Sequence, residues 1–161
     1  MKKIWFLPAA AAVAAAAALV TFVMVSGRET GAQAGSSAQQ EGRLVIQESG
    51  LSSDKVSFIR VDDSKIELLA RIGDDRHIKV ALGTCQSCKG SPWAYYTQRD
   101  DQLMCNNCGL TFALSVLDAP GGGCHPITLD SSIIKETEGQ VEISLDALRP
   151  YEYLFEKVES H

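Results

Sequence analysis

All five cysteines of this 161-residue chain lie in one short stretch, and their spacing limits what the chain can fold into. Two CxxC pairs, Cys85/Cys88 and Cys105/Cys108, are separated by 16 residues, and Cys124 follows 15 residues later. In metal ribbons with this spacing, each short knuckle offers two thiolates, and the hairpin between the knuckles brings the two pairs together. The pattern therefore predicts a loop region that is stapled by a metal.

Other interpretations of the cysteines fit less well. Five cysteines cannot all pair in a disulfide framework, although an extracytoplasmic location would favour one. A thioredoxin-type site needs Cys85 at a helix N-terminus, and the KGSP sequence at residues 89–92 would break that helix. Covalent haem attachment needs CxxCH, and neither Cys88 nor Cys108 is followed by histidine. A Rieske centre needs two histidine ligands, and only His125 is near.

Three kinds of metal centre remain open. A closed zinc site would use the two CxxC pairs and leave Cys124 and His125 without a role. An iron–sulfur cluster would also take four thiolates. Copper(I) would suit soft thiolates, with Met104 or His125 as an additional ligand. The cysteine spacing alone does not choose among these three.

Three glycines, Gly121, Gly122 and Gly123, directly precede Cys124 and His125. Glycines allow the backbone to approach a bulky centre closely and to donate amide hydrogen bonds to its sulfurs, so we predict that they are cofactor-binding. The alternative is a flexible turn before a buried free cysteine. We treat His125 as a candidate metal ligand, with a hydrogen-bonded structural histidine as the alternative.

The N-terminal region has the properties of a membrane anchor. Residues 4–25 are an uncharged, alanine-rich run of 22 residues, which as a helix spans the roughly 30 Å apolar core of a bilayer. Lys2 and Lys3 precede this run and favour a cytoplasmic N-terminus. We predict that residues 1–27 are a single-pass transmembrane helix in the cell membrane, with the rest of the chain extracytoplasmic. The alternative is a signal peptide that is cleaved at the A-x-A sequence of residues 32–34.

The remaining chain divides into a linker and a domain. Residues 28–42 are rich in Gly, Ser, Ala and Gln, and we expect a flexible linker. Residues 43–161 are expected to form a mostly β domain, with a small α+β fold as the alternative. An apolar segment at 66–72, the turn signal of Asp74 and Asp75, and a strand at 77–82 whose apolar residues alternate predict a hairpin. Alternation also predicts a later strand at 141–145.

Two further segments bear on the fold. Between the CxxC pairs, residues 93–96 and 102–104 are expected to be the two arms of a hairpin. The apolar positions in residues 151–158 fit a helix and a strand equally well.

Charge and composition exclude some classes of function. The chain has 15 basic and 20 acidic residues, and its net charge changes from −5 to −7 when residues 1–27, with two lysines and no acid, are left out. An acidic domain repels phosphate groups, which argues against nucleic acid or anionic lipid as a partner. The sequence contains no recognisable Ser/His/Asp set or paired carboxylates, so we expect no enzyme, and at most an electron-transfer component.

Several motifs together resemble one family. They are VALGTCQSC at residues 80–88, Tyr95-Tyr96, CNNCG at residues 105–109, Phe112 and GGGCHPI at residues 121–127. In this combination, residues 55–148 resemble the FtrD-like domain, which is described as membrane iron–sulfur-containing. The metal ligands of that family correspond here to Cys85, Cys88, Cys105, Cys108 and Cys124.

The resemblance implies a membrane-anchored, metal-binding component of an iron-uptake system. Such a component works with an iron permease and copper-type periplasmic redox partners, and is thought to handle electrons. We therefore expect an iron–sulfur centre that exchanges one electron, with the two CxxC pairs as ligands and Cys124 as a fifth candidate. A structural zinc-ribbon module that recruits a membrane partner and a copper-binding protein remain the alternatives.

Overall fold

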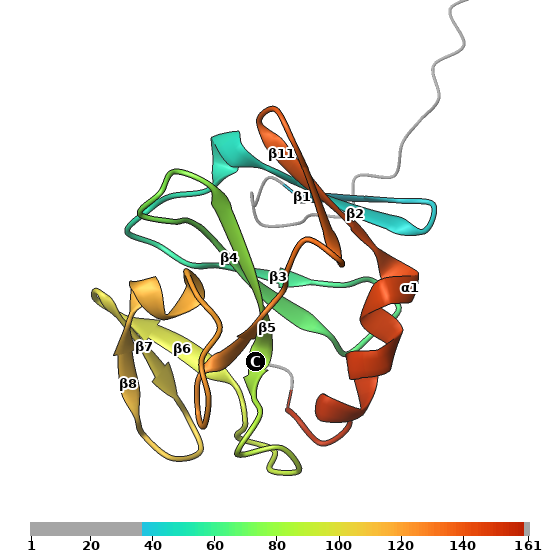
Figure 1. Cartoon of the computed structure of the whole chain (residues 1–161). Helices are drawn as coiled ribbons and strands as arrows, with labels where there is room; N and C mark the ends of the chain where they lie inside the picture. Colours follow the sequence, from blue (N-terminus) through green and yellow to red (C-terminus); the bar gives the residue numbers. More distant parts are fainter. Residues whose placement is uncertain (1–36, 160–161) are drawn as a thin grey trace, which may run out of the picture. The chain divides into compact units, whose positions relative to one another are not determined.

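The computed structural model describes residues 37–159, which form three antiparallel β sheets and four short helical segments (Figure 1). The mostly β class predicted from the sequence is confirmed. The first sheet has the strand order β1-β2-β11-β10, the central sheet β3-β4-β5-β9, and the small sheet β6-β7-β8.

Each element is short, as is usual for a small β domain. The strands of the first sheet are β1 (Ser37–Gln40), β2 (Arg43–Gln47), β10 (Ile134–Thr137) and β11 (Gln140–Ser144). Those of the central sheet are β3 (Ser57–Arg60), β4 (Glu67–Ile72), β5 (Ile78–Cys85) and β9 (Pro126–Thr128). Those of the small sheet are β6 (Tyr96–Arg99), β7 (Gln102–Cys105) and β8 (Thr111–Ala113). The helical segments are η1 (Glu48–Gly50), η2 (Leu114–Leu117), α1 (Leu145–Leu148) and η3 (Arg149–Leu154).

The hairpin predicted from residues 66–72 and 77–82 is confirmed as β4 and β5. Ile72 pairs with Ile78, and Leu68 pairs with Leu82, across an antiparallel ladder. The turn between the strands contains Arg76 in a left-handed conformation with φ 67°, and Gly73 accepts and donates the backbone hydrogen bonds that close it. This hairpin supplies the middle of the central sheet.

The hairpin between the CxxC pairs is also present, but its first arm begins later than predicted. Tyr96 to Arg99 form β6, so the expected arm at residues 93–96 contributes only its last residue. The two-residue turn at Asp100 and Asp101 places Asp100 at φ 53°, a conformation that aspartate tolerates better than most residues. The polar β6 sequence pairs through its backbone, a feature that apolar periodicity does not detect.

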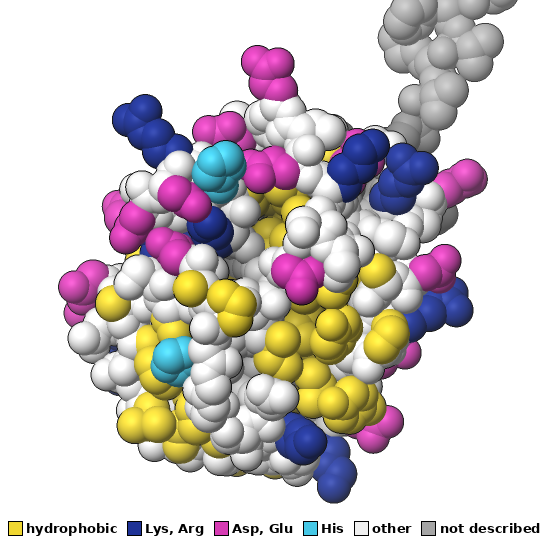
Figure 2. Space-filling model, in the orientation of Figure 1, with side chains coloured by type: hydrophobic (Ala, Val, Ile, Leu, Met, Phe, Trp, Pro, Cys, Tyr) yellow, Lys and Arg dark blue, Asp and Glu magenta, His cyan; other side chains and the backbone are white. Residues whose placement is uncertain are grey.

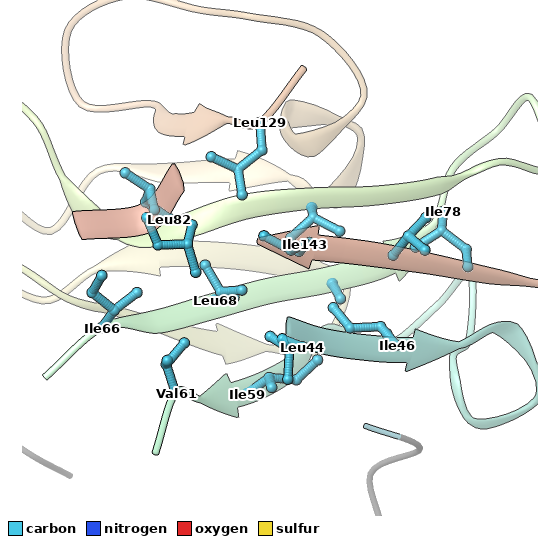
Figure 3. Close-up of a cluster of buried hydrophobic side chains, with 14 of the residues drawn as sticks. Leu44, Ile46, Ile59, Val61, Ile66, Leu68, Ile78, Leu82, Leu129 and Ile143 are labelled. Carbon is cyan, nitrogen blue, oxygen red and sulfur yellow. The ribbon is translucent and has the colours of Figure 1, made fainter. Parts of the chain in front are cut away.

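The main core lies between the first sheet and the central sheet (Figure 3). Ile78, Val80 and Leu82 of β5 share the face that points into this core, as their alternation predicts. Leu154 and Phe155 close one end of it. Of the ambiguous tail at residues 151–158, residues 151–154 adopt the helical alternative as part of η3. The main core contains Leu44, Ile46, Ile59, Val61, Ile66, Leu68, Ala70, Ile78, Val80, Leu82, Leu129, Val141, Ile143, Leu148, Leu154 and Phe155.

A second core lies on the opposite face of the central sheet. Leu69 of β4 and Ala81 of β5 pack there against residues of the small sheet and η2. Cys85 and Cys105 are fully buried members of this cluster. The second core contains Val56, Leu69, Ala81, Cys85, Tyr96, Leu103, Cys105, Leu114 and Leu117.

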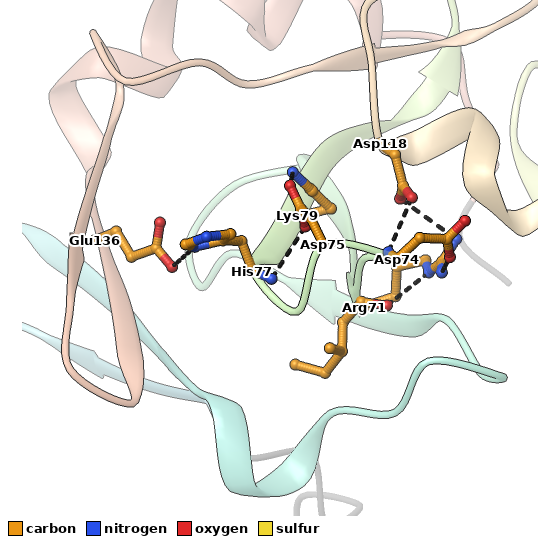
Figure 4. A network of polar contacts seen from close by, with 8 residues as sticks. Arg71, Asp74, Asp75, His77, Lys79, Asp118 and Glu136 are labelled. Carbon is orange, nitrogen blue, oxygen red and sulfur yellow. Dashed lines mark hydrogen bonds and ion pairs between the residues drawn. The ribbon is translucent and has the colours of Figure 1, made fainter.

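A buried arginine links the second core to the central sheet (Figure 4). The guanidinium of Arg71 is almost fully buried and pairs with Asp74 at 2.8 Å and with Asp118 at 3.4 Å. Asp118 lies at the end of η2 and also accepts a hydrogen bond of 3.1 Å from the backbone N–H of Asp74. Because breaking a buried pair leaves a charge uncompensated, these contacts fix η2 on the β4–β5 turn.

The predicted domain boundary at residue 43 is too late. Ser37–Gln40 form β1, which pairs with β2 from Ser37↔Ile46 to Gln40↔Arg43, within the segment expected to be a linker. The strand has no large apolar side chain and is held by its backbone pairing, with Gly42 at φ 72° in the turn. Residues 28–36 of the expected linker and the predicted anchor at residues 1–27 lie outside the described residues. Among residues 37–159, no helix is long and apolar enough to cross a membrane.

Loss of packing in the main core should destabilise the domain. Ile143 of β11 is fully buried in this core, and we expect Ile143→Ala to lower the free energy of unfolding by about 2–5 kcal/mol. Urea unfolding of the full chain in detergent, followed by circular dichroism, measures this change. Glu138→Ala, at the exposed β10–β11 turn, is the control and should leave stability within about 0.5 kcal/mol. A loss of less than about 0.5 kcal/mol for Ile143→Ala would contradict the packing described.

Candidate metal centre

The five cysteines come from three separate parts of the chain. Cys85 ends β5, and Cys88 lies in the turn that follows it. Cys105 ends β7, and Cys108 lies in the corresponding turn before β8. Cys124 lies in the loop that leads into β9. The two CxxC turns are therefore knuckles at the ends of strands, as the sequence predicts.

Backbone hydrogen bonds shape each knuckle and join the two. The N–H of Cys88 donates to the carbonyl of Cys85 at 3.2 Å, and the N–H of Gly109 donates to the carbonyl of Cys105 at 2.8 Å. Gly109 has φ 73°, which favours glycine at the exit of the second knuckle. The N–H of Asn106 donates to the carbonyl of Tyr95 at 2.9 Å, which ties the second knuckle to the chain after the first.

The structure brings all five thiols into two overlapping groups. The sulfurs of Cys85, Cys88 and Cys105 lie within 4.8 Å of one another, and so do those of Cys88, Cys108 and Cys124. The Cys88–Cys105 sulfur distance is 3.9 Å, and the Cys108–Cys124 sulfur distance is 3.5 Å. All five cysteines are free thiols, and Cys88 belongs to both groups. The disulfide framework weighed in the sequence analysis is not formed in this structure.

The thiols differ in their surroundings and in their acidity. Burial raises the pKa of Cys85 from 9.0 to about 11 and that of Cys105 to about 12. Cys108 is exposed, and a hydrogen bond from the backbone N–H of Leu110 lowers its pKa. The neighbouring thiol of Cys108 raises the pKa of Cys124. One side of the cluster is therefore enclosed by apolar packing, and the other side is open to water.

Tyr96 holds the third part of the site in place. Its ring is fully buried in the second core, and its hydroxyl donates a 2.7 Å hydrogen bond to the carbonyl of Cys124. Burial strongly raises the pKa of Tyr96, so the phenol stays protonated and keeps donating. The sequence analysis did not assign this role to Tyr96. The only available signal is its position on β6, opposite Cys105 in the ladder.

The structure does not place His125 among the thiols. Its ring packs edge-on against Phe112, with ring centroids 4.9 Å apart, and neither thiol group includes it. Gly121 leaves room for this ring, because a Cβ atom there would lie 1.8 Å from the His125 Nδ1 atom. Of the three glycines predicted to bind a cofactor, Gly121 therefore accommodates His125, and Gly123, at φ 68°, allows the turn before Cys124.

Met104, the other extra ligand considered for copper, is also turned away. Successive side chains of a strand point to opposite faces, and Met104 directly precedes Cys105 on β7. Leu103 and Cys105 are buried on the side of the second core, so Met104 faces the other side. The donor set at the described site consists of thiols.

Five clustered thiols with no carboxylate or imidazole among them are a donor set for a thiophilic metal. The fold and the site together thus define a small β domain with a cysteine cluster that can bind metal. The chain belongs to the FtrD-like family, because the family model described as membrane iron–sulfur containing protein FtrD-like matches residues 37–155. Comparison with curated proteins and with solved structures gives no match.

The role found for Gly121 predicts a difference between two neighbouring glycines. We expect Gly121→Ala to displace the His125 ring, to shift Cys124, and to weaken metal binding about 10-fold, as changes beside metal ligands commonly do. Gly122→Ala is the matched control, because a Cβ atom there meets nothing within 4 Å. Competition with a chelator measures both affinities. Equal affinities for the two variants would show that the packing of His125 does not position Cys124.

The raised thiol pKa values predict how the metal-free protein responds to alkaline pH. An unfolded cysteine ionises near pH 9, whereas Cys85 and Cys105 ionise at about 11 and about 12 when folded. Between these values the unfolded chain binds fewer protons, so the stability contributed by these thiols is full below pH 9 and falls as the pH rises to about 12. Urea unfolding of metal-free protein at several pH values measures this fall. Cys85→Ala should make the free energy of unfolding depend less steeply on pH. An unchanged slope would contradict the raised pKa of Cys85.

Proposed function

We propose that this protein is a membrane-anchored, extracytoplasmic iron–sulfur protein that carries electrons for an iron-transport system. The observation that carries the proposal is the gathering of five free thiols, from two knuckles and a third loop, at one place in the fold. The family description names a membrane iron–sulfur protein, which supports both the location and the type of centre.

The donor set fits this kind of centre. Iron–sulfur clusters are commonly held by four cysteine thiolates, and the two knuckles offer Cys85, Cys88, Cys105 and Cys108. Cys124 is the fifth candidate and lies 3.5 Å from Cys108, so it can replace a ligand or hydrogen-bond to one. When bound, such a centre supplies one-electron exchange, with a potential that depends on burial and on hydrogen bonds to sulfur.

The residues of this chain serve such a role in two ways. Burial of Cys85 and Cys105 in the second core excludes water from one side of the site. On the other side, Cys108 is exposed and Leu110 is 53% exposed, so a redox partner can approach there. Figure 2 shows one face of the domain, on which charged side chains lie at the top, along the right edge and at the lower right, and are sparse over the lower left.

The proposed partners follow from the family resemblance. They are an iron permease and copper-type periplasmic redox proteins, with the cell membrane as the place where they meet. The protein itself is not proposed to be an enzyme, and its chemistry is limited to electron transfer. The acidic net charge of the chain argues against a nucleic-acid partner.

The sulfur spacing favours a second candidate function. A single tetrahedral ion bound at about 2.3 Å from each thiolate holds its sulfurs about 3.8 Å apart. The sulfurs of Cys88 and Cys105, one from each knuckle, lie 3.9 Å apart, which is close to this value. A structural zinc site that stabilises the knuckles and presents them to a membrane partner is therefore the alternative.

Metal and acid-labile sulfide analysis separates the two candidates. The full chain is purified in detergent without oxygen, and iron, zinc, copper and sulfide are measured together with the visible absorption spectrum. We expect iron with near-equal sulfide and a brown colour. Zinc without sulfide, in a colourless protein that unfolds when a chelator is added, would overturn the electron-carrier proposal and support the structural one.

A further inference from the structure

We propose that the Tyr96 hydroxyl tunes the metal centre by turning its hydrogen bond from the Cys124 carbonyl to the Cys85 sulfur when Cys85 binds metal. Tyr96 is then a positioning residue, which acts on the centre through the sulfur of a ligand. This inference deepens the proposed function and rests on it in one respect, that Cys85 is a metal ligand.

The Tyr96 hydroxyl reaches the thiols from inside the second core. Tyr96 begins β6, pairs with Cys105 of β7 in the ladder, and has no exposed surface. Its hydroxyl donates to the Cys124 carbonyl at 2.7 Å and is also in hydrogen-bond contact with the Cys85 thiol. One phenol therefore contacts two of the three parts of the chain that supply thiols, and its backbone pairs with the third.

The hydroxyl has to choose between these two acceptors. It carries one proton, so it donates one full hydrogen bond at a time. In the structure Cys85 is a free thiol, and the hydroxyl donates to the Cys124 carbonyl. The sulfur of a protonated thiol is a weak acceptor, so the carbonyl is the better partner as long as Cys85 keeps its proton.

Metal binding reverses this preference. Cys85 binds a metal as a thiolate, and its S–H proton leaves for the solvent. A hydrogen bond to an ionised acceptor is roughly twice as strong as one to a neutral acceptor. Because Cys85 and Tyr96 are both fully buried, the phenol is better placed than bulk water to donate to this sulfur. The hydroxyl therefore turns to the sulfur, and no proton passes from one residue to the other.

The third loop can accommodate the loss of this hydrogen bond. Cys124 is partly exposed, so water can replace the hydroxyl as the donor to its carbonyl. A Cβ atom at Gly122 or Gly123 would meet nothing within 4 Å, which shows that the loop before Cys124 has room to adjust. The change is therefore confined to the open side of the site.

A hydrogen bond to the Cys85 sulfur affects the reduced centre more than the oxidised one. Reduction adds negative charge to a metal centre and its sulfurs, and a donor directed at a sulfur stabilises that charge. Burial strengthens the interaction, because the surroundings of Cys85 are apolar. The Tyr96 hydroxyl therefore raises the reduction potential of the centre.

Tyr96→Phe tests this effect on the iron-loaded protein. The full chain is purified in detergent without oxygen, and its reduction potential is measured by titration with redox dyes. We expect Tyr96→Phe to have a lower potential than the wild type, because the variant keeps the ring and lacks the donor. Tyr95→Phe is the matched control, because the Tyr95 ring lies beside Trp93, and it should keep the wild-type potential. An unchanged potential in Tyr96→Phe, with an unchanged visible spectrum, would overturn the inference.

A second substitution strengthens the donor instead of removing it. Tyr96→3-fluorotyrosine, introduced at this position alone, keeps the shape of the side chain and makes its hydroxyl a better donor. Burial holds the pKa of Tyr96 far above its usual range, so the fluorinated phenol stays protonated as well. We expect a higher potential than that of the wild type, and an equal or lower one would overturn the inference. This variant also decides the matter if Tyr96→Phe does not fold, which circular dichroism checks.

Cobalt(II) gives a readout that does not depend on iron or sulfide. The full chain in detergent is freed of metal, cobalt(II) is added without oxygen, and the sulfur-to-cobalt charge-transfer band is recorded. A hydrogen bond lowers the energy of the sulfur electrons, so we expect the band of Tyr96→Phe to lie at longer wavelength than that of the wild type. Tyr95→Phe should match the wild type. One wavelength for all three proteins would overturn the inference.

The outcomes distinguish the inference from the proposed function. Zinc without sulfide in the purified protein would remove the electron carrier, and a shifted cobalt band in Tyr96→Phe would leave the hydrogen bond to Cys85 standing. An iron–sulfur centre whose potential is the same in Tyr96→Phe would keep the carrier and remove the inference. Binding of no metal, cobalt included, would overturn both.

Discussion

Burial of strand β5 on both faces is the constraint on which the rest of the structure depends. Ile78, Val80 and Leu82 point into the main core, while Ala81 and Cys85 point into the second core. The two cores therefore share β5, and each packs against one of its faces. Because the strand continues directly into the first knuckle, the position of the first thiol is set by packing that involves no metal. The first sheet and the small sheet then act as covers for one shared central layer.

The packing that positions the thiols also changes their pKa values. Burial raises the pKa of Cys85 and Cys105, because a thiolate in apolar surroundings is poorly solvated. Both thiols are therefore neutral at ordinary pH, and a bound cation would favour their thiolate forms. Tyr96 stabilises the arrangement from the protein side through its hydrogen bond to the Cys124 carbonyl. The fold thus has its own cores, and its clustered thiols can hold a metal.

Apolar periodicity predicted the features that packing decides, and missed those decided by the backbone or by distant contacts. The hairpin of β4 and β5 was predictable because two apolar runs flank the turn signal of Asp74 and Asp75. Strand β1 was not, because its SAQQ sequence carries no apolar signal and is ordered by pairing with β2. The spacing of the cysteines predicted that the knuckles would meet. It did not predict that His125 would turn toward Phe112, since that depends on a contact between separate loops.

The pairing of β5 with β9 has a consequence for the segment between them. Ala81 pairs with Thr128 and Cys85 with Pro126, so the two ends of the cysteine-bearing segment leave from neighbouring strands, which in a sheet are about 4.8 Å apart. The segment is therefore an insertion in the central sheet, and the sheet itself already bears the entropic cost of closing that loop. An antiparallel sheet of another protein with the same strand neighbours offers the same two attachment points. The thiol-bearing segment is held to its own sheet by an apolar face and also by the ion pair of Arg71 with Asp118, so a sheet that received it would have to supply both.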